Sequence, residues 1–262
     1  MKEKFLINKK IRNPFFSIIT VVKNSEKEVT KTIKSLIKQS FRNFEYIIID
    51  GLSKDKTLSK ILKNKKHITK LLSEKDEGIY FAMNKGLNLA KGEIVVFVNA
   101  GDTLTKHGLK KIFEIFDKNK KIDFVFGTVM RHYTKDKILK HGFNINRLKY
   151  NFDFATSHST GFYIKRRKFI QVGKFNTSYK CSSDYDLYYK AIIKHKLKGG
   201  YTKKKDLIGI VSKGGFSSTY SYLDHLKEEM RIRFNNNQSI FIILLIAINS
   251  IFKNFFKIIK NK

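Results

Sequence analysis

The chain has 262 residues, a length that fits one large α/β domain or such a domain with a small appendage. Hydrophobic residues make up 42% of it and aromatic residues 13%, enough for a packed core, so a disordered basic tail is excluded. The formal net charge of +32 indicates an anionic partner, and composition alone leaves nucleic acid, anionic lipid and a phosphate-bearing substrate open.

Strands and helices alternate through the first half of the chain. Apolar, β-branched runs predict strands, and apolar residues that recur at helical spacing predict the helices between them. Continuous apolar strands with intervening helices indicate a parallel sheet covered on both faces, with the strand-to-helix loops along one edge. The predicted order is strand 15–22, helix 29–39, strand 44–50, helix 57–64, strand 69–73, helix 78–92, strand 93–98 and helix 109–119.

After Ile122 the pattern changes to longer strands that look more exposed. The absence of an internal repeat or a low-complexity linker favours one compact unit, 1–238. The predicted elements are strands 123–134 and 137–143, a strand running into a helix over 159–173, a helix over 184–196, a strand with a glycine-rich loop over 206–219, and a helix over 222–234.

Three of the four early strands end beside an acidic residue: Asp50, Asp76 and Asp102. Buried carboxylates are costly unless they meet a cation or hydrogen-bond donors, and in so basic a protein lysines can supply either. The spacing also suggests a site that recognises a nucleotide and holds a divalent metal through oxygen ligands. For the last of the three, the alternative is that Asp102 or Thr103 caps the next helix.

Three stretches, residues 15–57, 73–102 and 181–187, together resemble family 2 glycosyltransferases of the GT-A fold. The match is close from Phe16 to Leu104 and looser from Phe154 to Tyr189. The resemblance implies a GT-A, mostly parallel α/β sheet flanked by helices, and inverting transfer of a sugar from a nucleotide-diphosphate donor with Mn²⁺ or Mg²⁺. It also implies that 14–104 is the nucleotide-sugar-binding half and 105–238 the acceptor side.

The resemblance assigns roles to individual residues. Asp184 in "CSSDYDL" matches the general base on the acceptor side, and Asp102 closes the loop that corresponds to the metal motif. Asp50 matches the acid that holds the nucleotide base, and Asp76 matches the acid before the "GIYFAMNKG" helix. The residues expected to bind the nucleotide sugar are Asp50, Asp76, Asn84, Lys85, Asn99 and His158.

The chain departs from the family pattern at three positions. Gly51 stands where many relatives have a second acid, Asn99 or Ala100 replaces the first acid of the metal motif, and Phe81 stands where relatives have Asp. Metal binding would then depend on Asp102 and the donor phosphates. The "NAGD" form of the motif resembles bacterial enzymes that build surface polysaccharides.

The acceptor-side residues keep simpler interpretations beside the functional ones. Asp184 could be the N-cap of the helix that follows, where Ser182 and Ser183 compete for the same position. Asp186 is by default an acid in the first helical turn. His158 is equally consistent with a site residue and an ordinary loop histidine. The "SKGGFSST" loop could cover the acceptor or be a plain turn.

The C-terminal residues, 239–262, carry a different pattern. The uninterrupted apolar run Ile240 to Ile248 is shorter than the ~20 residues that a membrane span needs. Phe and Ile opposite Lys253, Lys257 and Lys260 are typical of a helix that lies in the headgroup region. We therefore predict an amphipathic tail that binds an anionic membrane surface. A helix packed on the domain and a contact in a homo-oligomer are the alternatives.

The family resemblance leads us to expect a metal-dependent, inverting glycosyltransferase. Its acceptor would be a glycan or a lipid-linked saccharide in the synthesis of O-antigen, capsule or lipooligosaccharide. The N-terminus lacks a signal-peptide pattern, and the single Cys181 fits a reducing compartment, so we expect a cytoplasmic enzyme on the inner face of the cytoplasmic membrane. A basic nucleic-acid-binding protein is the alternative. It explains the charge but not the carboxylate-ended strands, so no nucleic-acid partner is expected.

Overall fold

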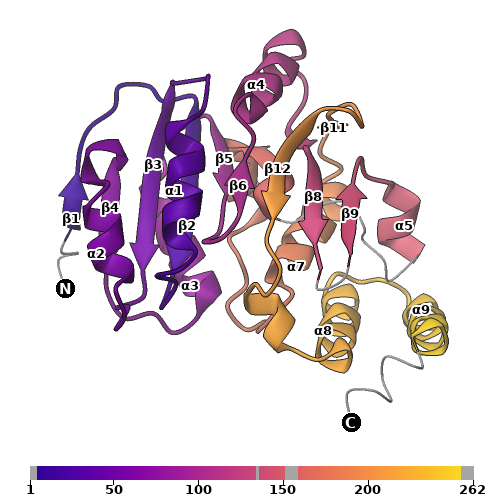
Figure 1. The fold of residues 1–262 in the computed structure, drawn as a ribbon. Coiled ribbons are helices and arrows are strands. Elements are labelled where there is room, and N and C mark those ends of the chain that lie inside the picture. The colour runs from indigo at the N-terminus through magenta and orange to yellow at the C-terminus, as the bar shows by residue number, and fades with distance from the viewer. Residues whose placement is uncertain (1–4, 134–135, 151–158, 255–262) are drawn as a thin grey trace.

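The computed structural model describes residues 5–133, 136–150 and 159–254, and its centre is a mixed sheet between two layers of helices (Figure 1). Eight strands form this sheet in the order β1-β4-β3-β2-β5-β10-β7-β11. The neighbours β4, β3, β2 and β5 are parallel, as the sequence predicts, whereas β1 and β10 join antiparallel. The strands are β1 (Phe5–Asn8), β2 (Phe16–Val22), β3 (Phe44–Asp50), β4 (Lys70–Ser73), β5 (Ile94–Phe97), β7 (Phe124–Phe126), β10 (Phe162–Lys165) and β11 (Gly199–Tyr201).

Helices cover both faces of the sheet, and this explains why the central strands are apolar without alternation. Every residue of β2 and β5 is buried. One face packs against α1 (Val29–Ile37), α2 (Thr57–Leu62) and α4 (Gly108–Lys118). The other packs against α3 (Ile79–Leu89), α6 (Arg166–Val172) and α7 (Ser183–Tyr189).

Helix α3 lies close against the sheet because it carries a glycine at the point of contact. A Cβ at Gly86 would lie 2.4 Å from Cγ2 of Ile19 on β2, a distance that real side chains do not adopt. The glycine therefore allows the helix backbone to approach the strand. This contact places the start of α3 at the carboxyl-terminal edge of the parallel strands.

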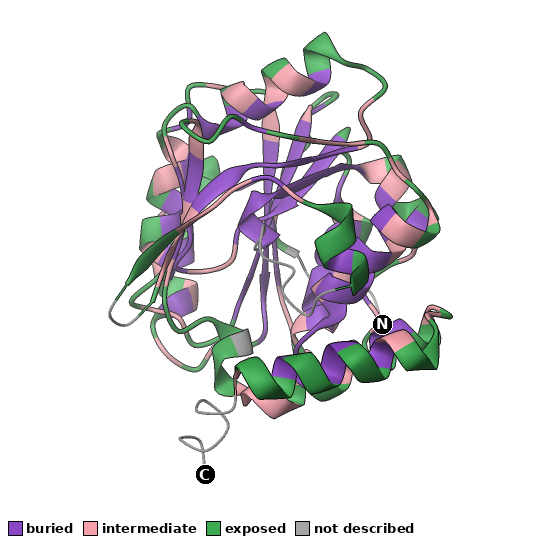
Figure 2. Ribbon diagram, turned by 90° about the vertical axis from the view of Figure 1, so that its right-hand side faces the viewer, coloured by how far each residue is buried: buried purple, intermediate pink, exposed green. Residues whose placement is uncertain are grey.

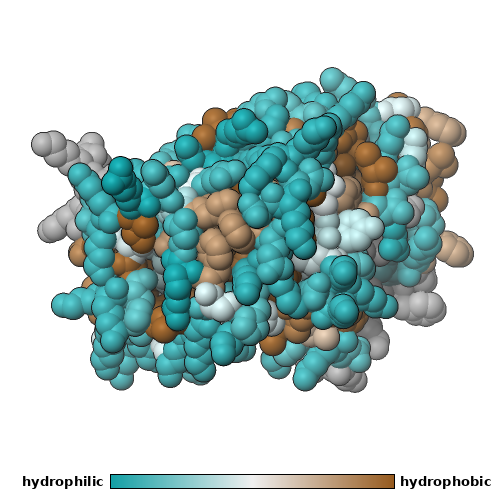
Figure 3. Space-filling model, turned by 90° about the horizontal axis from the view of Figure 1, so that it is seen from above, coloured by the Kyte–Doolittle hydropathy of each residue, from teal (hydrophilic) through white to brown (hydrophobic). Residues whose placement is uncertain are grey.

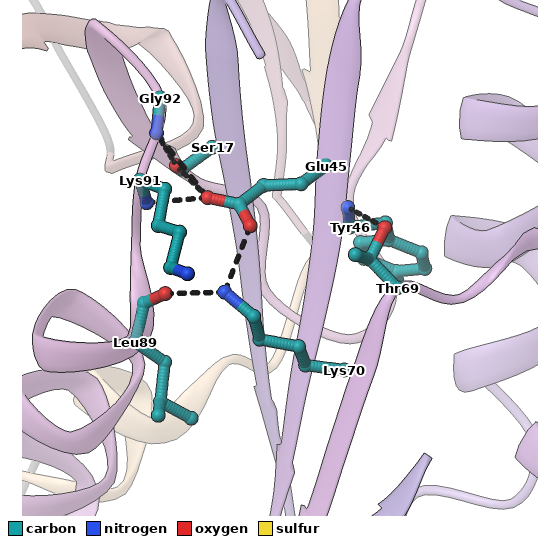
Figure 4. A network of polar contacts seen from close by, with 8 residues as sticks. All are labelled: Ser17, Glu45, Tyr46, Thr69, Lys70, Leu89, Lys91 and Gly92. Atoms are coloured by element: carbon teal, nitrogen blue, oxygen red, sulfur yellow. Dashed lines mark hydrogen bonds and ion pairs between the residues drawn. The ribbon is translucent and has the colours of Figure 1, made fainter. Parts of the chain in front are cut away.

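The opposite, amino-terminal edge is held together by a buried ion pair (Figure 4). Nζ of Lys70 lies 2.9 Å from Oε2 of Glu45, and the two side chains are 8% and 2% exposed. The same carboxylate accepts hydrogen bonds from the Ser17 hydroxyl and from the backbone N–H groups of Lys91 and Gly92. One carboxylate thus joins β2, β3, β4 and the turn before β5, away from the edge where the acidic loops lie.

The run 123–134, predicted as one strand, is divided between two sheets. Its first part is β7, and its second part is β8 (Thr128–His132) in a separate sheet of order β6-β12-β8-β9. In this second sheet β12 is parallel to β8 and antiparallel to β6. No break in polarity marks the change of sheet, so the sequence pattern could not show it. The remaining strands are β6 (Thr103–Leu104), β9 (Lys137–Lys140) and β12 (Leu207–Val211).

Two other predictions about elements are corrected. The helix expected over 184–196 is α7 followed by a π-helical turn, Lys190–Lys194. Strand β1 was not predicted, because four residues of an edge strand are too short a run to show a period. The shorter elements are α5 (Ile145–Tyr150) and the 3₁₀ turns Lys65–His67, Ser159–Gly161 and Phe216–Thr219.

The last two described helices are α8 (Tyr222–Asn235) and α9 (Ile240–Lys253). They lie at the end of the molecule where the parallel strands terminate (Figure 1). Helix α8 begins with a capping box between Ser221 and Asp224. In Figure 2, α9 lies across the bottom with its buried residues toward the domain and its exposed residues turned away. Within the described ranges, none of the helices combines the length and the apolarity needed to cross a membrane.

Candidate active site

Asp50 ends β3 at the carboxyl-terminal edge and is fully buried. Its carboxylate accepts a hydrogen bond of 2.6 Å from the Ser73 hydroxyl at the end of β4, and others from the N–H and hydroxyl of Ser53. The two serines thereby satisfy the buried charge and fix the turn after β3. The sequence singled out the carboxylate but not the two serines.

Asp76 and Lys85, both expected to bind the nucleotide sugar, form an ion pair beside this turn. Nζ of Lys85 lies 2.7 Å from Oδ1 of Asp76 and 2.6 Å from Oε1 of Glu74. Burial lowers the pKa of Lys85, but the two carboxylates outweigh it and the pKa is raised, so the lysine stays charged. A Cβ at Gly51 would lie 3.1 Å from Oδ2 of Asp76, so the glycine leaves room for this carboxylate next to Asp50.

Asn84, one turn along α3, is hydrogen-bonded to the backbone of Phe175 in the second half of the chain. Its Nδ2 donates to the Phe175 carbonyl at 2.9 Å, and its Oδ1 accepts from the Phe175 N–H at 3.0 Å. Both ends of the amide are thus bonded to one backbone position. Contact of Asn84 with a nucleotide sugar stays a prediction, and in this structure the side chain joins the two halves.

The turn that carries Asn99 and Asp102 follows β5 and is held from three sides. Asp102 is 4% exposed, and its carboxylate accepts from the Thr160 hydroxyl at 2.6 Å and from the Ser212 N–H at 2.9 Å. On the α1 side, the Thr32 hydroxyl donates to the Asp102 carbonyl at 2.8 Å. Helix α4 begins only at Gly108, so the alternative that Asp102 or Thr103 caps it is wrong.

Asn99 lies in the same turn, and the two ends of its amide differ in their contacts. Its Nδ2 donates to the Ser159 hydroxyl at 3.2 Å. In the part of the chain that the structure describes, Oδ1 of Asn99 is buried and accepts no hydrogen bond. A buried polar atom of this kind is costly unless a ligand meets it. His158, predicted to lie in the same region, falls outside the described residues.

Asp184 is the only residue between 181 and 189 that is not buried. It is the second residue of α7, whose N-cap is Ser182, so the interpretation of Asp184 as the cap is wrong. Oδ1 accepts the Tyr185 N–H at 2.9 Å. The preceding residue, Ser183, donates its N–H to the Tyr80 hydroxyl oxygen at 3.1 Å.

Tyr80 therefore links helix α3 to the loop of Asp184. Burial raises the pKa of Tyr80 well above its ordinary value, and the negative charge of Asp184 raises it further. The phenol of Tyr80 therefore stays protonated. The family resemblance assigns "GIY" to a nucleotide motif, and no local pattern in the sequence indicates this contact.

Asp186 lies in the first turn of α7, as predicted, and its side chain is buried and bonded. It is 1% exposed, Nζ of Lys190 lies 2.6 Å from Oδ2, and Asn236 donates to Oδ1 at 3.1 Å. Its ion pair with Lys190 spans one turn, and Asn236 connects it to the end of α8. Asp186 thus anchors α7, while its neighbour Asp184 stays accessible.

An open hollow of about 560 Å³ lies elsewhere, between α1 and β6. It is lined by Thr30, Ser35, Thr103, Leu104 and four lysines, Lys31, Lys34, Lys38 and Lys106. None of the predicted site residues lines it. The candidate site is thus defined by the polar side chains at the carboxyl-terminal edge and not by this cavity.

Comparison with known proteins identifies the family. A family model for glycosyl transferase family 2 matches residues 17–183. A PGL/p-HBAD biosynthesis glycosyltransferase of Mycobacterium tuberculosis H37Rv is 28% identical over 177 residues, covering 66% of this chain and 68% of that protein. A poly(ribitol-phosphate) β-N-acetylglucosaminyltransferase, TarS of Staphylococcus aureus, is 33% identical over 109 residues, but these cover only 19% of that protein.

Solved structures show the same fold. Residues 1–349 of S. aureus TarS in complex with UDP-GlcNAc match with a TM-score of 0.69 at 20% identity, covering 91% of this chain and 72% of that one. A mannosyltransferase from Pyrobaculum calidifontis, in complex with GDP-Man and Mn²⁺, matches with a TM-score of 0.63 at 16% identity, covering 94% and 72%. The chain belongs to glycosyltransferase family 2 and has the GT-A fold.

Proposed function

We propose that this protein transfers a sugar from a nucleotide-diphosphate donor to a hydroxyl of a surface glycan or its lipid-linked precursor, with inversion at the anomeric carbon. The proposal rests on one observation above all, the hydrogen bond from the Ser183 N–H to Tyr80. It joins the edge that carries Asp50, Asp76 and Lys85 to the loop that carries the partly exposed Asp184. The family membership favours this enzyme over the nucleic-acid-binding alternative.

On the donor side, Asp50 and Asp76 would hold the nucleoside and Lys85 would face the diphosphate. Lys85 stays charged because of Asp76 and Glu74, so it can attract phosphate oxygens without a change of protonation. Names of the structural relatives support such a donor, since their complexes contain UDP-GlcNAc and GDP-Man. A screen of nucleotide sugars would identify the nucleotide and the sugar that this chain takes.

On the acceptor side, Asp184 would accept the proton of the attacking hydroxyl. A general base must lie within hydrogen-bond reach of that proton, and Asp184 is the accessible carboxylate of an otherwise buried segment. The hydroxyl oxygen then attacks the anomeric carbon from the side opposite the leaving diphosphate, which produces inversion. The carboxylate also stabilises positive charge that develops on the sugar.

A divalent Mn²⁺ or Mg²⁺ ion is part of the proposal, with Asn99 and Asp102 as its protein ligands. The described residues contain no group of three or more His, Cys, Asp or Glu side chains that could hold a metal alone. Mg²⁺ in proteins commonly uses one or two carboxylates with substrate phosphates, and the buried free Oδ1 of Asn99 beside Asp102 fits this small set. When bound, the ion would neutralise charge on the departing diphosphate.

The exposed side of α9 supports a membrane location for the acceptor. Several apolar side chains there are strongly exposed, including Phe241 at 67%, Ile248 at 65% and Phe252 at 84%. The net charge of +32 favours an anionic leaflet as the surface that covers them. The helix lies at the end of the molecule where the parallel strands terminate, so docking would bring that edge toward the lipid (Figure 1).

The test is a screen of nucleotide sugars. Hydrolysis and transfer are measured with UDP-, GDP- and CMP-sugars, with Mn²⁺ and with a chelator, beside thermal unfolding in each nucleotide. We expect turnover with one nucleotide class and a metal-dependent rise in the unfolding temperature with the same nucleotide. Absence of turnover with all three classes, together with salt-sensitive RNA binding, would overturn the proposal.

A further inference from the structure

The loop before Asp184 is held by a carboxylate from another helix. Glu228 of α8 accepts hydrogen bonds from the N–H groups of three successive residues, Lys180 at 2.5 Å, Cys181 at 2.9 Å and Ser182 at 2.9 Å. The thiol of Cys181 lies 3.3 Å from the same oxygen, Oε2. Successive N–H groups that converge on one anion form a nest, and bonds to an ionised acceptor are stronger than neutral ones.

The next N–H along the chain, that of Ser183, is bound to Tyr80. Four successive amides are therefore bonded to side chains from two different helices, α8 on one side and α3 on the other. The first amides of a helix have no partner within the helix itself, and α7 has only seven residues. Glu228 and Tyr80 therefore supply acceptors that the four amides would otherwise lack.

Asp184 leaves the backbone directly after these four amides. We propose that Glu228 is a positioning residue, which fixes the loop so that the carboxylate of Asp184 meets the acceptor hydroxyl. This inference rests on the proposed role of Asp184 as the base. Proton transfer requires heavy atoms within ~2.6–3.2 Å, and a displacement of about 1 Å costs about a hundredfold in rate. Glu228 acts through the backbone and has no part in holding the donor.

The main experiment compares the full-length protein with its Glu228→Gln variant. Gln keeps the size and one acceptor oxygen but turns an N–H₂ group toward the row of amides. We expect turnover with acceptor to fall about tenfold to a hundredfold, while the affinity for the nucleotide sugar, measured by calorimetry, stays within twofold. Glu114→Gln is the matched control, because it removes one exposed carboxylate from α4, and it should behave as wild type.

A second variant, Tyr80→Phe, loosens the same loop from the α3 side by removing the oxygen that accepts the Ser183 N–H. It should also lower turnover at unchanged donor affinity, and it provides the test if Glu228→Gln does not fold. Wild-type turnover in either folded variant would overturn the inference, as would a parallel loss of turnover and donor affinity. If the wild-type enzyme has no activity with any nucleotide sugar, the proposed function fails instead.

Discussion

The carboxylate of Asp184 is expected to matter for the reaction and little for the fold. Asp184→Asn is nearly isosteric, and its amide oxygen can still accept the Tyr185 N–H, but it cannot take a proton from the acceptor. We expect transfer to fall by at least about a hundredfold with unchanged donor affinity and unfolding temperature. Calorimetry and turnover measurements on the same preparation test this prediction. A collapse of donor affinity would show that the general base is a different residue.

Asp102 is expected to carry two roles, which its variants can separate. Asp102→Ala would leave the Thr160 hydroxyl and the Ser212 N–H without their acceptor, at a cost of about 1–3 kcal/mol for the buried Thr160 and less for the partly exposed Ser212. Asp102→Asn keeps one acceptor oxygen but loses the charge. Both should lower transfer on the order of a thousandfold through the loss of a metal ligand, but only Ala should strongly lower the unfolding temperature.

Thr160→Val serves as the control for these two variants, because it removes the hydroxyl and leaves Asp102 in place. Manganese binding in the presence of nucleotide diphosphate is the second measurement. If Asp102→Asn keeps turnover within tenfold of wild type, Asp102 is not a metal ligand. Its contacts with Thr160 and Ser212 would then be its whole contribution.

The thiol of Cys181 should be unreactive in the folded protein. Burial is the main cause and the neighbouring Glu228 adds to it, and together they raise its pKa from 9.0 to about 12. At pH 8 the thiolate is therefore about a thousandfold rarer than in the unfolded chain, and the thiolate is the reactive form. The folded pKa is the higher one, so the stability that the buried neutral thiol contributes is present below pH 9 and is lost as the pH rises toward 12.

Labelling of Cys181 with a thiol reagent, with and without denaturant, measures the ratio of the thiol's reactivity in the unfolded and folded protein. Equal rates would show that the loop opens readily.

The buried Glu45 is expected to stabilise the sheet without affecting the donor site. Glu45→Gln breaks the ion pair with Lys70 and leaves that lysine in a buried position (Figure 4). Loss of one partner of a buried pair costs about 3–5 kcal/mol, so the free energy of unfolding should fall by that order. Denaturant unfolding measures the loss. Donor affinity at the opposite edge should not change in the folded variant, and a change there would show that the two edges are coupled.

Helix α9 differs from the amphipathic pattern that its sequence suggested. Its buried side is formed by Ile243, Ile246, Ala247 and Ser250, and Tyr222 of α8 donates to the Ser250 carbonyl at 3.1 Å. Its opposite side is also apolar and exposed, and Lys257 and Lys260 lie outside the described residues. The structure shows α9 packed on the domain, and membrane binding is a proposal for its exposed side.

The full-length protein is expected to bind anionic vesicles in a partly salt-resistant manner. Its charge contributes attraction that salt screens, because the screening length falls to ~3 Å at 1 M, whereas insertion of the apolar side of α9 is not screened. Changing Phe241, Ile248 and Phe252 together to Asn should remove the salt-resistant part of vesicle binding. The packing of α9 against α8 should be unchanged. Flotation with anionic and neutral vesicles at low and high salt measures both parts.

Ile170→Asn is the control for this experiment, because Ile170 is 51% exposed on a different helix, α6. Equal flotation of the triple variant and the wild type would exclude α9 as the anchor. A dimer that the triple variant loses would assign the surface to self-association instead. Hydrophilic side chains cover most of the face at the top of Figure 1, at the other end of the molecule from α9 (Figure 3).

The sequence determined the parallel strands and the edge at which their loops meet. Period and apolarity are local properties, so the runs around β2, β3, β4 and β5 carried enough information to identify them as buried parallel strands and to place the loops of Asp50 and Asp76 at one edge. The family resemblance directed attention to Asp184, and the structure shows that this residue alone is accessible in a buried segment. The roles of these residues stay predictions.

Only the tertiary structure decided how the two halves are joined. Ser212 reaches Asp102 across 110 positions of the chain, Ser183 reaches Tyr80 across 103, and Ser182 reaches Glu228 across 46. No local pattern marks such partners, because each contact depends on how whole helices and strands pack. The same reason explains the second sheet, since the change at Gly127 follows from which strands are free to pair and not from the residues of the run itself.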